Sequence, residues 1–203
     1  MGGEYLPLLL IAGIPGSGKT TVAAHLDHAV VISADDFYLD VDDPRLPKHN
    51  GRPDWEALTA LNVEGLRRSV IELLKGRRVM IPCYDMSLSS AVGERLVDPE
   101  GACAVVVEGL HVFDMQLTVP TKIFRVLIVS SRWKILLRRL KRDIREGRYS
   151  RYDAFRSVVP LFFRYRDYNQ CQSKKADYVV HYCGQPAVVA KRLKEVTNYW
   201  AKT

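Results

Sequence analysis

The sequence has little cysteine and no long hydrophobic run. Its four cysteines, Cys83, Cys103, Cys171 and Cys183, form no C-x-x-C pair, which argues against a disulfide-rich secreted scaffold and a paired-thiol metal site. No stretch approaches the roughly 18 apolar residues that a membrane-spanning helix needs. The opening residues 1–4 lack the basic region of a secretory signal. We therefore expect a protein of the reducing cytoplasm without a membrane partner.

Acidic residues are fewer than basic ones. Thirty Lys and Arg against 23 Asp and Glu give a formal net charge of +7, which favours an anionic partner such as a phosphate ligand, a nucleic acid or an acidic membrane face. Solubility alone would explain the same charge. With 47% hydrophobic and 26% charged residues and no internal repeat, residues 1–203 are expected to form a single domain. The composition is compatible with a homo-oligomer as well as with a monomer.

Apolar runs and helical patterns alternate along the chain. Continuous apolar runs predict buried strands at residues 6–12, 29–33, 79–84, 102–107, 123–129 and 177–181. Helices are predicted at residues 21–27, 54–75, 133–146, 152–168 and 186–201, with a loop at 41–53 and an irregular segment or hairpin at 87–99. This order is typical of an α/β fold with a mainly parallel five-stranded sheet, in which the binding site lies at the carboxyl ends of the strands.

One glycine-rich segment matches a phosphate-binding motif in full. Residues 13–20 read GIPGSGKT, which is the G-x-x-x-x-G-K-[ST] pattern between a predicted strand and a predicted helix. In this P-loop, backbone N–H groups surround the phosphates of a nucleoside triphosphate, the lysine lies between the β- and γ-phosphates, and the last hydroxyl binds Mg²⁺. The residues expected to bind ATP are Gly13, Ile14, Pro15, Gly16, Ser17, Gly18, Lys19, Thr20 and Thr21.

The motif also separates this chain from two other nucleotide-binding classes. Its glycines run G-x-x-G-x-G, which is not the dinucleotide-binding order. The chain has no N-K-x-D motif for reading guanine, so residues 98–101, which fit the loose D-x-x-G pattern of GTPases, are interpreted as a turn. We expect a P-loop NTPase with three α/β/α layers.

Acidic side chains follow three predicted strands. Asp35 comes after residues 29–33, where it would accept the proton of an acceptor hydroxyl or orient it; capping the next element is an equal alternative. Glu108 ends another strand beside the P-loop. Tyr84 and Asp85 end a third strand, where the Tyr84 ring would stack on a substrate and Asp85 would accept from its hydroxyls. Ordinary packing at the strand edge is an equal alternative. The expected Mg²⁺ ligands are Thr20, Asp35 and Glu108.

Arginine is concentrated in residues 132–151, which carry nine basic and two acidic side chains. Helical spacing places Arg138, Arg142 and Arg145 on one face, where three guanidinium groups would suit the charge of a transferring phosphoryl group. A solvated basic helix and a nucleic-acid patch are the alternatives. We predict a mobile helical lid at about residues 132–152.

Six segments in order resemble one family of kinases. They are GIPGSGKT, ISADDFY, PCYD, VVVEGLHVF, RRLKRDIREGR and ADYVV, and they resemble the uridine kinase / phosphoribulokinase family of P-loop kinases, most of all its uridine–cytidine kinases. The resemblance covers about residues 8–180. It implies an ATP- and Mg²⁺-dependent kinase that phosphorylates the 5′-hydroxyl of a ribonucleoside, a small-molecule substrate, and no nucleic-acid partner.

The resemblance also implies roles for single residues. Asp35 is similar to the family's catalytic aspartate, which acts with Lys19, and Tyr38 belongs to the same motif. Asp54 resembles the acid that binds the ribose hydroxyls. Tyr84, with its neighbour Asp85, resembles the site where the base stacks, and Glu108 resembles the glutamate associated with magnesium. Four arginines of the lid are expected to contact phosphates and substrate. Arg139 and Arg142 are expected to be catalytic, and Arg142 also to contact the acceptor. Arg138 and Arg148 are expected to bind ATP.

The acceptor site departs from the family pattern. The pyrimidine-reading histidine usually stands a few residues after Tyr-Asp, and here Ser89 lies nearest that place. Related kinases act on nicotinamide riboside, pantothenate, glycerate or sugars, which stay open as alternative acceptors. A nucleic-acid-associated NTPase ranks below all of these, because it gives no use to the Asp35–Tyr38 segment or to Tyr84.

Overall fold

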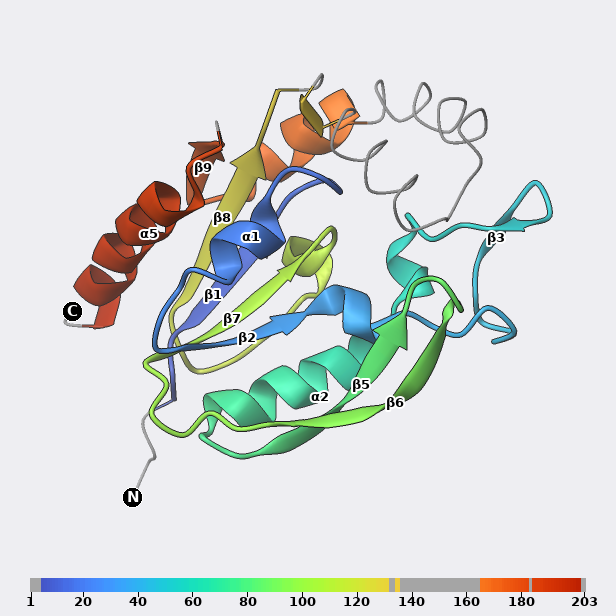
Figure 1. The fold of residues 1–203 in the computed structure, drawn as a ribbon, viewed down its shortest axis with the longest axis horizontal. Helices are drawn as coiled ribbons and strands as arrows, with labels where there is room; N and C mark the ends of the chain where they lie inside the picture. Colours follow the sequence, from blue (N-terminus) through green and yellow to red (C-terminus); the bar gives the residue numbers. More distant parts are fainter. Residues whose placement is uncertain (1–4, 132–133, 136–164, 183, 202–203) are drawn as a thin grey trace.

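The centre of the molecule is a parallel sheet. The computed structural model describes residues 5–131, 134–135, 165–182 and 184–201. Five strands lie in the order β2-β7-β1-β8-β9 (Figure 1), and every neighbouring pair is parallel. Their bounds are β1 Leu8–Ala12, β2 Ala29–Ser33, β7 Ala104–Gly109, β8 Ile123–Val129 and β9 Tyr178–His181. The predicted α/β class with a five-stranded parallel sheet is confirmed.

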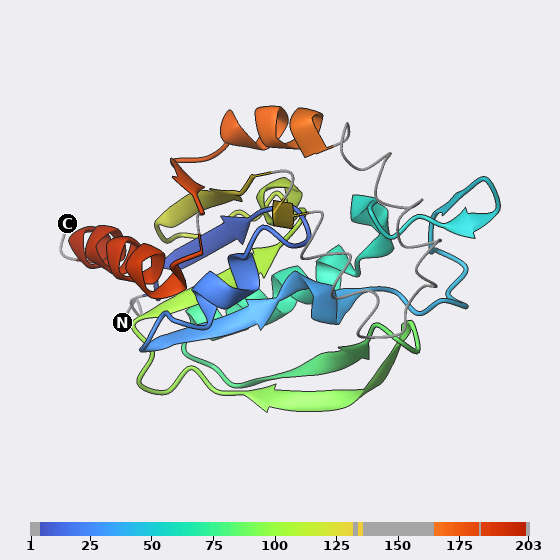
Figure 2. The same ribbon diagram turned by 45° about the horizontal axis from the view of Figure 1, so that its top comes forward.

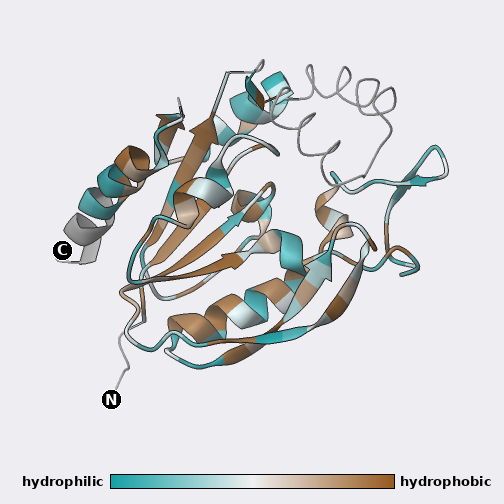
Figure 3. Ribbon diagram, in the orientation of Figure 1, coloured by the Kyte–Doolittle hydropathy of each residue, from teal (hydrophilic) through white to brown (hydrophobic). Residues whose placement is uncertain are grey.

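Side chains of the central strands alternate between two apolar cores. Leu8 and Leu10 of β1 pack with helix α2 (Val63–Leu74), whereas Leu9 and Ile11 face helices α1 (Lys19–Ala23) and α5 (Pro186–Ala201). Because successive strand residues point to opposite faces, one fully buried strand supplies both cores. Figure 2 shows the resulting layers, and Figure 3 shows that the central strands are hydrophobic along most of their length.

Two predicted helices are shorter than their apolar patterns. The helix predicted at 21–27 begins at Lys19 and ends at Ala23. The prediction of helix over residues 54–62 is wrong: Leu39 N–H donates to Ala60 O at 2.9 Å and Asn62 N–H to Phe37 O at 2.7 Å. These bonds hold the backbone there in a 3₁₀ turn, η2 (Leu58–Ala60), and an extended bridge. Only after Asn62, whose side chain accepts from Gly65 N–H at 3.0 Å, does α2 begin.

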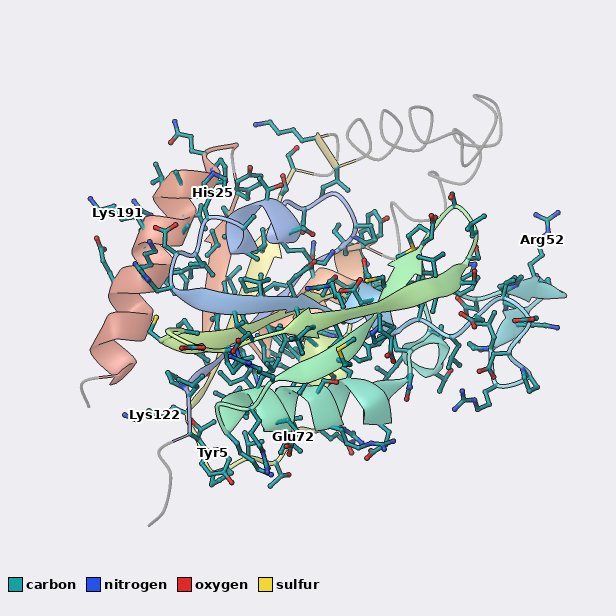
Figure 4. The ribbon with its side chains drawn as sticks, turned by 60° about the horizontal axis from the view of Figure 1, so that its bottom comes forward. Tyr5, His25, Arg52, Glu72, Lys122 and Lys191 are labelled. Carbon is teal, nitrogen blue, oxygen red and sulfur yellow. The ribbon has the colours of Figure 1, made fainter. Side chains whose placement is uncertain are left out.

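Two antiparallel hairpins lie outside the main sheet. Strands β5 (Val79–Asp85) and β6 (Ser90–Val97) pair with each other, so the strand predicted at 79–84 forms a hairpin with the segment predicted as irregular or hairpin. A second, small hairpin joins β3 (Lys48–His49) to β4 (Arg52–Pro53). Figure 4 shows Arg52 on this small hairpin, far from Lys191 on α5.

The arginine-rich segment lies almost entirely outside the described residues. Of its members only Lys134 and Ile135 are described, and both are helical. Ile135 is buried against Ile14 of the glycine-rich loop and Tyr165. Among the helices in the described ranges, none is long and apolar enough to cross a membrane.

Candidate active site

The P-loop connects β1 to α1 at the carboxyl edge of the sheet. Gly16 and Gly18 have φ angles of +84° and +102°, which the other amino acids seldom adopt. Ser17 and Lys19 are buried, whereas Thr20 and Thr21 are exposed to the pocket in front of the loop. The loop therefore has the bend and the solvent-facing hydroxyls that its motif predicts.

Gly18 is also required by its neighbour. A Cβ atom at this position would lie 2.4 Å from the ring of Tyr182, which follows β9. Tyr182 is held by its own backbone, since its N–H donates to Val129 O at 2.7 Å and its carbonyl accepts from Ser130 Oγ at 3.2 Å. Glycine is thus needed here both for its φ and for its lack of a side chain.

The Glu108 carboxylate contacts three polar side chains beside the P-loop. Its Oε1 accepts hydrogen bonds from Thr20 Oγ1 at 3.0 Å and from Ser33 Oγ at 2.9 Å, and its Oε2 lies 3.5 Å from Lys19 Nζ. Only 2% of Glu108 is exposed. A buried carboxylate needs such partners, and these bring together the ends of β7 and β2 with the start of α1.

The residues present fit a magnesium–triphosphate complex. Within the described part of the chain, Ser17 Oγ and Glu108 Oε2 are buried and lack a hydrogen-bond partner. The same residues contain no cluster of three His, Cys, Asp or Glu side chains able to hold a metal alone. Mg²⁺ usually takes one or two protein ligands together with phosphate oxygens and water, and the Thr20 hydroxyl beside the Glu108 carboxylate offers such an incomplete site.

Asp35 shares a pocket with the P-loop. The pocket has a volume of about 350 Å³. Its lining consists of Pro15, Gly16, Gly18, Lys19, Thr20, Thr21, Asp35, Tyr182 and Gly184. Asp35 enters it from η1 (Ala34–Phe37), a 3₁₀ turn that Ser33 caps by accepting the Asp35 N–H at 3.3 Å. The sequence left open whether Asp35 caps the next element, and in the structure Ser33 is the residue that caps it.

Three aromatic rings meet at the far end of η1. Tyr38 lies 5.7 Å from Trp55 and 5.7 Å from Tyr84 between ring centroids, and Trp55 lies 6.5 Å from Tyr84. All three are partly buried. Tyr84 donates its hydroxyl hydrogen to Leu39 O at 3.2 Å. Burial and the nearby Asp40 carboxylate raise the pKa of Tyr84 to about 12, so its phenol stays neutral and remains a donor.

The β5–β6 hairpin reaches this cluster through its contacts with the segment that follows η1. Arg95 pairs with Asp36 at 3.1 Å, Asp40 Oδ1 accepts from Ala91 N–H at 2.8 Å, and Val41 N–H donates to Ser89 O at 2.9 Å. These contacts set Tyr84 against Tyr38. Ser89, which stands where the family's histidine was expected, is part of the hairpin turn with a φ of +52°.

The two other predicted acceptor acids are engaged in local turns. Asp54 Oδ1 accepts from Glu56 N–H at 3.2 Å, and its own N–H donates to Pro47 O at 2.8 Å. Asp85 Oδ1 closes the hairpin turn by accepting from Ser87 N–H at 2.7 Å and Ser87 Oγ at 2.6 Å. Each acid is next in sequence to a ring of the aromatic cluster, Asp54 to Trp55 and Asp85 to Tyr84.

The predicted lid arginines cannot be placed relative to the P-loop. Arg138, Arg139, Arg142, Arg145 and Arg148 all lie outside the described residues. Their roles in binding phosphate or acceptor therefore stay predictions.

Several residues of the site were missed from the sequence. Trp55 lies in residues 54–62, which were predicted as helix and form turns instead, and Tyr182 meets Gly18 only because β9 pairs with β8. Ser33 and His111 could have been found by asking which polar groups end the strands or follow them, since they flank Asp35 and Glu108 in the sequence.

Comparison with known proteins agrees with this geometry. The model of the Phosphoribulokinase / Uridine kinase family matches residues 8–188. The chain belongs to this family. It is 29% identical over 158 residues to a uridine kinase of Saccharomyces cerevisiae, covering 70% of this chain and 31% of the yeast protein. It is 26% identical over 160 residues to a uridine kinase of Ureaplasma parvum, covering 75% of this chain and 74% of the Ureaplasma protein.

A solved structure confirms the fold. A protein of Bacillus stearothermophilus described as a possible uridine kinase superposes with a TM-score of 0.54 and 19% identity, over 88% of this chain and 90% of that chain. The predicted P-loop fold with three α/β/α layers is therefore confirmed. The chain spans less than a third of the yeast relative, but about three quarters of the Ureaplasma one.

Proposed function

We propose that the chain is an ATP-dependent kinase of a small hydroxyl compound, and that its acceptor is the 5′-hydroxyl of a ribonucleoside. The single observation that carries this proposal is the pocket shared by the P-loop and Asp35. A carboxylate facing a triphosphate cradle has room to meet an alcohol at the γ-phosphate. The family membership of the chain supports the same class of reaction.

The donor side follows from Lys19 and its partners. The loop amides and the Lys19 ammonium hold the phosphates, and Glu108 keeps Lys19 and Thr20 in place through contacts at 3.5 and 3.0 Å. Thr20, Glu108 and Asp35 would hold Mg²⁺, which neutralises charge that develops on the phosphate oxygens. The arginines predicted for the lid would add positive charge.

The transfer itself exchanges one P–O bond for another. The acceptor oxygen bonds to the γ-phosphorus, the bond from that phosphorus to the bridging oxygen breaks, and ADP leaves with the bonding electrons. Asp35 orients the hydroxyl and takes its proton as the new bond forms. Because such transition states are loose, positioning and charge contribute more than the strength of the base.

The aromatic cluster supports a planar acceptor. Tyr38, Trp55 and Tyr84 present ring faces and edges within 6.5 Å of one another, and such rings suit a nucleobase. Asp54 precedes Trp55 and is our candidate for binding the ribose hydroxyls. With Ser89 in place of a histidine, the identity of the base is the least constrained part of the proposal.

The experiment is a panel of acceptors. ADP release with Mg-ATP should be measured with uridine, cytidine, nicotinamide riboside, pantothenate, glycerate and hexoses. We expect saturable turnover with a ribonucleoside and none with the compounds that lack a base. Saturable turnover with a hexose or glycerate alone would overturn the assignment of the acceptor, and ADP release that needs polynucleotide instead would overturn the kinase.

A pair of variants separates stacking from general effects in this panel. Tyr84→Ala removes the ring and should raise the acceptor KM by about tenfold or more, in line with about 1–3 kcal/mol for stacking of a base on an aromatic ring. Tyr84→Phe keeps the ring and loses only the bond to Leu39 O, so its KM should stay close to that of the unaltered chain. Equal effects of the two changes would contradict a stacking role.

A further inference from the structure

His111 links the segment that follows β7 to the segment that carries Trp55. It follows β7 and begins η3 (Val112–Asp114), and its Nε2 lies 2.7 Å from the carbonyl oxygen of Glu56. A carbonyl oxygen only accepts, so Nε2 must carry the hydrogen of this bond. Glu56 directly follows Trp55 in the chain, which places the bond next to the aromatic cluster.

Asp114 lies on the other side of the imidazole ring. His111 Nδ1 lies 3.7 Å from Asp114 Oδ2. The same carboxylate accepts a hydrogen bond from Gln172 Nε2 at 2.9 Å and pairs with Lys175. His111 is the largest cause that lowers the pKa of Asp114, which keeps the carboxylate ionised. Asp114 is thus fixed beside the ring edge opposite the bond to Glu56, and the ring is oriented by the hydrogen bond from its Nε2.

The support continues into the helix of residues 165–173. Tyr168 donates its hydroxyl hydrogen to Leu110 O at 2.5 Å, and Gln172 is only 4% exposed. Burial raises the pKa of Tyr168, so this donor stays protonated. The loop of residues 110–114 is therefore anchored by a packed helix on one side and presents His111 to Glu56 on the other.

We propose that His111 is a positioning residue for the acceptor: by binding the Glu56 carbonyl it fixes the backbone beside Trp55 and so sets the shape of the aromatic cluster. This inference rests on the proposed function, in which that cluster binds the acceptor. A ring that contacts a planar ligand must be held within a few tenths of an ångström. Loss of the bond would loosen Trp55 without touching the P-loop.

The kinetic test compares two substitutions of His111. His111→Ala should raise the acceptor KM about tenfold while kcat and the KM for ATP change less than twofold. His111→Gln places an amide N–H near the position of Nε2 and should restore most of the acceptor affinity. His49→Ala, at an exposed position on β3, is the matched control and should leave all three constants unchanged.

A fluorescence test does not depend on knowing the acceptor. The chain has three tryptophans, Trp55, Trp133 and Trp200, so that Trp133→Phe with Trp200→Phe leaves Trp55 as the sole emitter. In this background His111→Ala should shift the emission to longer wavelength and increase quenching by acrylamide, and His111→Gln should reverse both changes.

The results distinguish this inference from the proposed function. An active unaltered chain whose Trp55 emission and acceptor KM are the same in His111→Ala overturns the role of His111. Equal increases in the KM for acceptor and for ATP also overturn it, because they indicate general damage. If no acceptor is turned over by the unaltered chain, the kinase proposal fails, and the emission of Trp55 still decides whether His111 positions that ring.

Discussion

Glu108 connects the residues that the donor site needs. Through Oε1 it holds the hydroxyls of Thr20 and Ser33, and through Oε2 it faces the ammonium of Lys19 at 3.5 Å. A buried carboxylate with these partners organises the cation and the hydroxyl of the P-loop before any nucleotide arrives. We therefore treat Glu108 as the residue on which binding of the metal depends most.

Glu108→Gln should weaken the affinity of the enzyme for Mg²⁺ and so raise the Mg²⁺ concentration that it requires. The amide keeps the shape of the side chain but removes its charge, so the Mg²⁺ concentration for half-maximal activity should rise about 10- to 100-fold. A titration of activity with Mg²⁺ at fixed ATP measures this. Glu100→Gln, in an exposed ion pair with Arg78, is the control; overlapping Mg²⁺ curves for Glu108→Gln and the unaltered chain would refute the role.

Gly18→Ala should destabilise the protein through two separate costs. The φ of +102° disfavours any side chain, and the new Cβ would lie 2.4 Å from the Tyr182 ring. Gly76 has a φ of +73°, and a Cβ added there would have no atom within 4 Å. Gly76→Ala therefore has only the cost of the unfavourable backbone angle, about 1 kcal/mol. Urea denaturation should show Gly18→Ala less stable than Gly76→Ala by about 1–3 kcal/mol, and equal losses would mean that Tyr182 moves aside freely.

At the residue scale, sequence predicts the donor site better than the acceptor site. Thr20 and Glu108 could be placed because a contiguous motif and the ends of parallel strands meet at one edge of a sheet. Trp55 could not, because its place depends on hydrogen bonds between a loop and the backbone of residues 37–39. Asp85, predicted at the acceptor, caps a hairpin turn that local sequence does not distinguish from a binding site.

At the scale of elements, the strands of the main sheet and β5 were predicted within about two residues, whereas β3 and β4 form a hairpin inside the segment predicted as a loop. Continuous apolar runs marked β2 and β8, which were predicted with the bounds that the structure has. Helix α5 was likewise predicted at residues 186–201. The helix over residues 54–62 was wrong because leucines spaced as in a helix also occur where tertiary hydrogen bonds extend the backbone.

The packing of α5 on α1 gives a prediction at this scale. Leu193 is fully buried with Val22 and Leu26 in the core beneath the P-loop helix. Leu193→Ala should lower the free energy of unfolding by about 2–5 kcal/mol, and Val188→Ala, at a residue of the same helix that is 49% exposed, by less than about 0.5 kcal/mol. Urea denaturation of the two variants provides the comparison, and similar losses would mean that α5 does not close this core.

At the scale of the whole molecule, the aspartate behind His111 makes stability depend on pH. Interactions with His111, Lys175 and Gln172 lower the pKa of Asp114 below its usual value of 3.8. The unfolded chain therefore binds this proton more readily, and the contribution of Asp114 to stability is present above about pH 4 and is lost as the pH falls below it.

Asp114→Asn should remove this dependence. Free energies of unfolding from urea denaturation between pH 7 and pH 3 should fall more steeply on acidification for the unaltered chain than for the variant. The two curves should therefore approach each other at the acid end. Parallel curves across the whole range would show that Asp114 does not contribute in this way.

The P-loop and Asp35 follow two strands of one sheet that are separated by a single strand. β7 lies between β1 and β2, which brings Glu108 between the P-loop and Asp35. The aromatic cluster continues from Asp35 along η1. The residues that we propose for the donor, the metal and the acceptor thus lie along the same edge of the sheet.

The most direct test of this account is Asp35→Asn, assayed for turnover and for binding of ATP in parallel. The amide keeps the size of the side chain but cannot take the acceptor proton, so kcat should fall by about 10²- to 10⁴-fold. The Kd for ATP, measured by calorimetry without Mg²⁺, should stay within a few-fold, because the P-loop is unchanged. Near-normal turnover in this variant, with ATP binding intact, would contradict the central claim that Asp35 meets the acceptor hydroxyl at the γ-phosphate.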